Sequence, residues 1–107
     1  MPSQYDTVES LEIRILRLLC LHTPGDILTS SLATLIAYRW RDPEHRVVCE
    51  ALGRISFLSP ALRCHELAAE VTRMGFPDID CSAYFEEEAD KPEGLAELIR
   101  QVRAREH

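Results

Sequence analysis

Apolar residues recur along this chain at intervals of three and four, the spacing of amphipathic helices, and no segment of strand length alternates apolar with polar residues. The pattern is clearest from Pro43 to Gly75, where it predicts two consecutive helices. Asp42 and Ser59 each precede a proline, the order of a helix N-cap followed by the first helical residue. Gly75 suits the left-handed residue that ends a helix, and Pro77 prevents the helix from continuing.

Each of these two helices has an apolar stripe. The first stripe contains Val48, Ala51, Leu52 and Ile55. Arg46 and Glu50 lie on another face, at the i,i+4 spacing of an ion pair. The second stripe contains Leu67, Ala68, Val71 and Met74, with Cys64 one turn earlier. Because the connection between the helices is short, we expect them to lie side by side.

A helix that Thr7 can cap is predicted before this pair. Its apolar residues are Val8, Leu11, Ile15, Leu18 and Leu19, widened by Ile13, Leu16 and Leu21. A helix that is apolar nearly all round is typical of the centre of a bundle. Glu9 and Glu12 lie at its front end, where acids favour the helix dipole.

Three more segments favour helix. Asp26 to Trp40 carries a stripe of Leu28, Leu32, Leu35 and Ile36. Asp78 to Ala89 predicts a short helix capped by Asp80 or Ser82. Pro92 to Arg105 predicts the last helix, whose stripe is Leu95, Leu98, Ile99 and Val102.

These elements predict an all-α fold, a compact single-domain bundle of five to six short helices. A chain of 107 residues suits one domain with one core, so we assign residues 1–107 to a single helical domain and expect residues 1–6 to be a flexible N-terminus. The four cysteines do not form a C-x-x-C pair, and we expect packed thiols rather than disulfides at Cys20, Cys49, Cys64 and Cys81.

The charge is unevenly distributed. The chain carries a net charge of −6, but Tyr38 to Arg63 carries five arginines against three acids, and Asp78 to His107 carries nine acids against four bases. An acidic total disfavours non-specific binding to nucleic acid without excluding it, and it permits binding to a basic protein surface.

No arrangement of residues in the sequence specifies a catalytic or cofactor site. The four glycines form no phosphate-binding loop, the histidines and cysteines lack the spacing of metal ligands, and no G-x-S-x-G motif is present. We therefore expect a protein that is not an enzyme and that holds no cofactor or metal.

Two features favour partner binding. Aromatic residues and arginines, which dominate interface energetics, interleave at Tyr38, Arg39, Trp40 and Arg41. The alternative is that Tyr38 and Trp40 close the end of the bundle while the arginines stay in solvent. The second feature is an acidic run containing Glu86, Glu87, Glu88 and Asp90, for which the alternative is a face that only confers solubility.

We expect a small acidic protein-binding module, an inhibitor, adaptor or antitoxin-like protein. One version is a host- or phage-encoded inhibitor whose carboxylates occupy a nucleic-acid-binding surface of its target. The sequence also allows a homodimer. The competing hypothesis is a transcriptional regulator, because the helix order from Val8 to Ile55 is similar in outline to a helix-turn-helix DNA binder. With no apolar run long enough for a membrane span and no secretory signal, we expect a cytoplasmic location.

Overall fold

The structure of the chain, a computed structural model, describes residues 7–21, 23, 25–86 and 94–105. The expected flexible segment 1–6 and Glu87, Glu88 and Asp90 of the acidic run lie outside the described residues. The described elements are helical and include no strand: α1 (Val8–Leu21), α2 (Gly25–Leu35), α3 (Pro43–Arg54), α4 (Pro60–Arg73), the 3₁₀ helix η2 (Cys81–Phe85) and α5 (Leu95–Ala104). The predicted all-α class is therefore confirmed.

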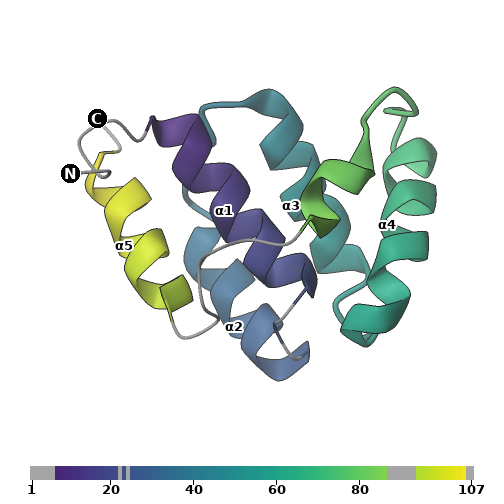
Figure 1. The fold of residues 1–107 in the computed structure, drawn as a ribbon, viewed down its shortest axis with the longest axis horizontal. Helices are drawn as coiled ribbons and strands as arrows, with labels where there is room; N and C mark the ends of the chain where they lie inside the picture. The colour runs from purple at the N-terminus through teal and green to yellow at the C-terminus, as the bar shows by residue number, and fades with distance from the viewer. Residues whose placement is uncertain (1–6, 22, 24, 87–93, 106–107) are drawn as a thin grey trace.

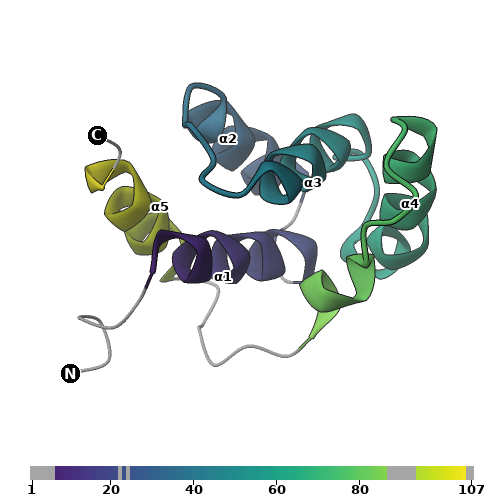
Figure 2. The ribbon, with the colours of Figure 1, turned by 90° about the horizontal axis from the view of Figure 1, so that it is seen from above.

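Helix α1 is the centre of the molecule (Figure 1). It packs against α3, α4, α5 and η2, and it buries Leu11, Ile15, Leu16, Leu18, Leu19 and Cys20. Helices α3 and α4 pack against each other, as the short connection between them predicted. Figure 2 shows α2 and α3 on one side of α1 and η2 on the other.

The helix ends follow the capping residues of the sequence. The Asp42 carboxylate accepts from the amide of Glu44 at 2.9 Å, and Pro43 is the first residue of α3. Asp80 caps η2 in the same way, accepting from the amide of Ser82 at 3.1 Å. Gly75, after the end of α4, has a φ of 98°, a left-handed conformation that favours glycine.

The predicted extent of the second helix is wrong at its C-terminal end. Helix α2 ends at Leu35, whereas the apolar pattern extended it to Trp40. Residues 36 and 37 form a turn, and residues 38–40 have no regular secondary structure. Beyond the helix end, the Tyr38 hydroxyl and the backbone amides of Arg41 and Asp42 donate to Glu12 of α1.

The predicted stripe of α4 is confirmed in part. Leu67 and Val71 are buried and Met74 packs against the core, but Ala68 is exposed, and Arg63 and Glu70 are buried in addition. Two charged side chains thus occupy core-facing positions. Glu70 bonds to Arg54 at 3.4 Å and to Arg73 at 2.6 Å.

Candidate functional site: a groove between α2 and α3

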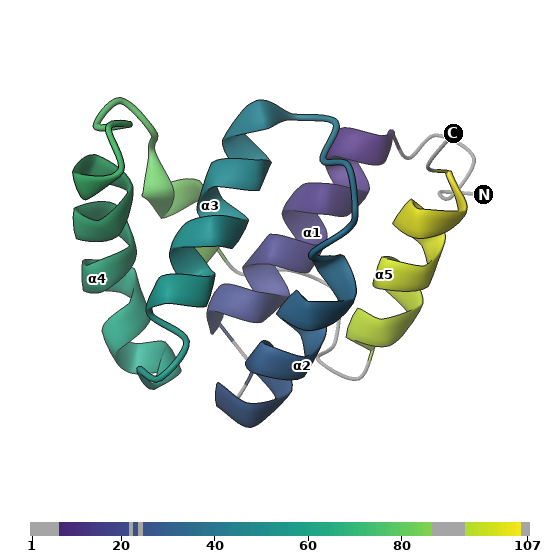
Figure 3. The same cartoon turned by 180° about the vertical axis from the view of Figure 1, so that it is seen from behind.

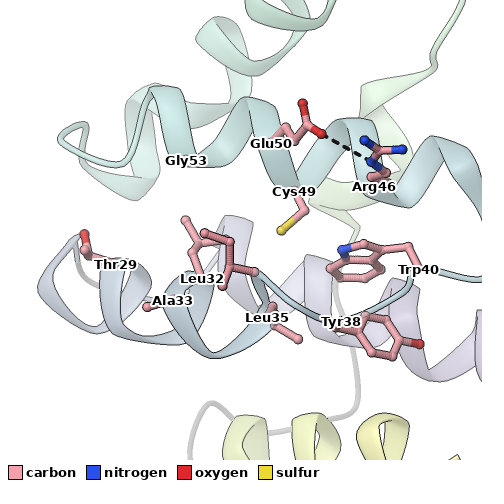
Figure 4. A pocket seen from close by; sticks show the side chains of 11 residues that line it. Thr29, Leu32, Ala33, Leu35, Tyr38, Trp40, Arg46, Cys49, Glu50 and Gly53 are labelled. Atoms are coloured by element: carbon pink, nitrogen blue, oxygen red, sulfur yellow. Dashed lines mark ion pairs between the residues drawn. The ribbon is translucent and has the colours of Figure 1, made fainter. Parts of the chain in front are cut away.

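An open groove of about 450 Å³ runs between α2 and α3; we call it the α2–α3 groove (Figure 4). Leu32 and Ala33 line it from α2, Ile36 lines it from the turn after α2, and Cys49 and Gly53 line it from α3. Ile36 is 87% exposed, unusually high for a large apolar side chain. On the α3 rim Arg46 and Glu50 form the predicted ion pair at 3.3 Å. The groove is therefore mainly apolar, with one balanced pair of charges at its edge.

Between its charged rim residues and the end of the helix, α3 lines the groove with an uncharged thiol and a glycine. Burial, with the neighbouring charge of Glu50, raises the pKa of the Cys49 thiol to about 12, so the thiol stays protonated at neutral pH. One turn further on, Gly53 has no side chain; a Cβ there would lie 3.9 Å from Leu32 Cδ1. The missing side chain leaves this part of the groove open.

Trp40 forms one end of the groove (Figure 4). Its indole lies edge-on to Tyr38, with ring centroids 5.0 Å apart, and edge-on to His45 at 6.4 Å. The His45 ring in turn contacts Tyr84 of η2 at 6.1 Å. Edge-to-face contacts of this kind are favourable for aromatic rings, so the rings of Tyr38 and His45 stabilise the position of the indole.

The segment that carries Trp40 is tied to α1 by one carboxylate. Glu12 is fully buried and accepts four hydrogen bonds, one from each of four residues. The Tyr38 hydroxyl donates at 2.5 Å, and the backbone amides of Arg41 and Asp42 donate at 2.6 and 3.3 Å. The fourth partner is His45 Nδ1 at 2.8 Å. Glu12 thereby fixes both the connection between α2 and α3 and the start of α3.

Glu12 remains ionised although it is buried. Burial opposes ionisation, but the hydrogen bonds from His45, Tyr38, Arg41 and Asp42 together hold the pKa of Glu12 below its ordinary value. Its negative charge also lies beside the N-terminus of α3, where the helix dipole favours an anion. On the far side of His45, burial and the Glu44 carboxylate raise the pKa of Tyr84, whose hydroxyl donates to Glu44 at 2.6 Å.

The structure separates the residues that the sequence singled out for partner binding. Tyr38 is 6% exposed and belongs to the core, the alternative that the sequence had left open. Trp40 is half-buried and lines the groove, and Arg39 and Arg41 are exposed beside it. Glu86, the described member of the acidic run, is exposed near η2 and pairs with Arg17 at 3.4 Å. Glu86 is not among the residues that line the groove.

Sequence reasoning missed Glu12 as the anchor of this site and placed it at the polar front of its helix. The signal was its position, because Glu12 lies four residues after Val8 and three before Ile15, inside the apolar stripe. A carboxylate at such a position must find donors when it is buried. Which residues supply those donors depends on the tertiary fold.

Within the described ranges, no group of three or more histidine, cysteine or acidic side chains could hold a metal ion. None of the helices described is long and apolar enough to cross a membrane. The chain matches no protein-family model, and no curated protein and no solved structure is similar enough to count as a match.

Proposed function

We propose that the chain is a small non-enzymatic module that binds another protein chain in the α2–α3 groove. The observation that carries this proposal is an open apolar groove whose end is formed by Trp40, a residue held in place by the Glu12 hydrogen bonds. Grooves between two helices receive the apolar face of a third helix, and a fixed aromatic side chain at the contact lowers the entropy lost on binding.

The chemistry of the groove favours binding over catalysis. Its charged lining residues, Arg46 and Glu50, neutralise each other, and the Cys49 thiol is protonated. A nucleophile or general acid requires an activated or unbalanced group in the pocket. The inhibitor, adaptor and antitoxin-like roles expected from the sequence all belong to this class.

The test compares two alanine-to-glutamate variants. Ala33 lies exposed in the groove, and Ala68 lies exposed on α4 outside it. Because a carboxylate buried in an apolar contact without a partner costs several kcal/mol, Ala33→Glu is expected to weaken partner binding at least about 100-fold. Ala68→Glu should bind as the unmodified chain does. Tagged variants are used to capture proteins from the source cell, and circular dichroism verifies that both remain helical.

One result would contradict the proposal. If Ala33→Glu captures the same partner as strongly as Ala68→Glu, the partner does not occupy the α2–α3 groove, and the binding surface lies elsewhere on the chain.

The DNA-binding alternative has less support. The connection between α2 and α3, residues 36–42, is longer than the three- to four-residue turn of a helix-turn-helix motif. Two arginines of the candidate recognition helix are engaged, Arg46 with Glu50 and Arg54 with Glu70. Salt-dependent binding to duplex DNA that Arg46→Glu weakens would favour the regulator, and no retention on DNA at low salt would exclude it.

A further inference from the structure

Helix α2 carries a single charged residue, Asp26 in its first turn. From Ile27 to Tyr38 the chain has no aspartate, glutamate, lysine or arginine, although 28% of all its residues are charged. The segment 27–54, which includes most of α2 and all of α3, carries four arginines against three acids. The excess negative charge of the molecule therefore lies outside this segment. This segment can therefore approach an identical segment without strong repulsion.

Helix α2 is also poorly covered. Leu28 and Leu35 are its buried apolar residues, whereas Ile27 is 51% and Ile36 is 87% exposed. Ile27 lines a separate hollow between α2 and α5, whereas Ile36, in the turn after α2, lines the α2–α3 groove. Beside Ile36 in this groove the exposed Ala33 carries a small side chain, which allows another helix to approach closely. On its other flank α2 meets α5, where Arg103 of α5 donates to the carbonyl oxygen of Thr34 at 3.0 Å. The side of α2 that faces the α2–α3 groove carries no charged residue, because its lining residues are Thr29, Leu32, Ala33 and Leu35.

The charges at the rim of the groove are self-complementary. Arg46 and Glu50 lie one turn apart on α3 and are 71% and 50% exposed. In a symmetric dimer each residue pair occurs twice, related by the two-fold axis. When two copies of α3 run antiparallel, Arg46 of one copy lies opposite Glu50 of the other, and the reverse pair forms as well.

We infer that the occupant of the α2–α3 groove is a second copy of this chain, so that two copies form a symmetric dimer through α2 and the α3 rim. This inference rests on the proposed function of the groove and names its partner. A typical stable interface buries about 800 Å² per partner. That is about one-eighth of the accessible surface of 6323 Å², and α2 and α3 together cover much of one face of the molecule (Figure 3).

A charge-swap experiment on the whole chain tests the inference. Sedimentation velocity over a concentration series should show the unmodified 12.2 kDa chain passing from monomer to dimer. Arg46→Glu alone places acids opposite acids at both rim contacts, and Glu50→Arg alone places arginines opposite arginines. Each is expected to raise the dimer dissociation constant at least about tenfold. An equimolar mixture of the two variants restores both attractive contacts and should dimerise about as well as the unmodified chain.

The outcomes separate this inference from the proposed function. Loss of the dimer in Ala33→Glu but not in Ala68→Glu, together with rescue in the mixture, supports the second copy. An unmodified chain that stays monomeric up to about 1 mM, a weak-binding limit, overturns the inference, as does a mixture that shows no rescue. If the chain is monomeric while Ala33→Glu still prevents capture of a different protein, the proposed function stands and only the second copy is excluded.

Discussion

Glu12 and Arg63 are both fully buried, yet the fold treats the two charges differently. Glu12 accepts four hydrogen bonds at the junction of α1, the connection after α2, and α3. Arg63 donates from Nη1 to the carbonyl oxygen of Leu19 at 2.7 Å, and its Nε and Nη2 find no partner among the described residues. Two equally buried charged groups therefore differ in how fully their polar atoms are hydrogen-bonded.

The pKa values of the two groups reflect this difference. Burial disfavours the charge of both, but the hydrogen bonds to Glu12 outweigh it and lower the pKa of that carboxyl. For Arg63 burial prevails and lowers the pKa of the guanidinium, although Cys20 opposes the shift. Glu12 organises the groove, whereas Arg63 supplies a cation to the C-terminal end of α1, where the helix dipole favours one.

The largest expected effect is that of Glu12→Ala. This change leaves buried donors of Tyr38, Arg41 and His45 without an acceptor, so we expect a loss of about 3–5 kcal/mol in the free energy of unfolding. Urea unfolding followed by circular dichroism at pH 7 measures it. Glu9→Ala, an exposed acid of the same helix, is the control and should change stability by less than about 0.5 kcal/mol. Similar values for the two variants would contradict the anchoring role of Glu12.

A second, intermediate effect concerns pH. Because the pKa of Glu12 is lower in the folded than in the unfolded chain, its contribution is complete above its ordinary value of 4.5 and is lost as the pH falls through the folded value. Glu12→Gln, which keeps the shape without the charge, should be about 2 kcal/mol less stable at pH 7. The gap should narrow as the pH falls below about 4.5 in unfolding titrations. A gap independent of pH would show that the charge of Glu12 is not what stabilises the junction.

The smallest expected effect is that of Arg63→Met. The substitution removes one hydrogen bond to Leu19, but it also removes a buried cation with two unpartnered nitrogens. Replacing an imperfectly paired buried charge by an apolar side chain is often neutral or stabilising, so we expect stability to change by less than about 1 kcal/mol. Thermal unfolding measures the change. A loss of about 3 kcal/mol or more would make Arg63 an anchor comparable to Glu12.

The sequence predicted some parts of the fold better than others. Two stripes were predicted fully: every residue of the α5 stripe is buried, as is every residue of the α3 stripe. The predicted helix ends at Asp42 and Gly75 were also correct. They depend on local features, because Asp42 acts through its own side chain and Gly75 through its own backbone conformation. The errors were local. In α4 Leu67 and Val71 are buried as predicted, but Ala68 is exposed and the charged Arg63 and Glu70 are buried. Helix α2 ends at Leu35, and Ile36 of its predicted stripe is 87% exposed.

The candidate site was predicted only in part. Trp40 and Tyr38 were chosen because of their residue types, and both line the groove, although Tyr38 is only 6% exposed. The groove itself lies between two consecutive helices, and its lining includes Ala33 and Gly53, which have no distinctive chemistry. Only the packing of α2 against α3 reveals such a surface.

Trp40 is the single tryptophan of the chain, and it stands at the end of the groove. Its fluorescence therefore reports on this one place, free of background from any other indole. A molecule that covers the groove displaces water from the half-exposed ring and shifts its emission to shorter wavelength, whereas release of the segment held by Glu12 exposes the ring and shifts the emission the other way. The protein thus carries its own optical probe of occupancy, and no label is needed to follow it.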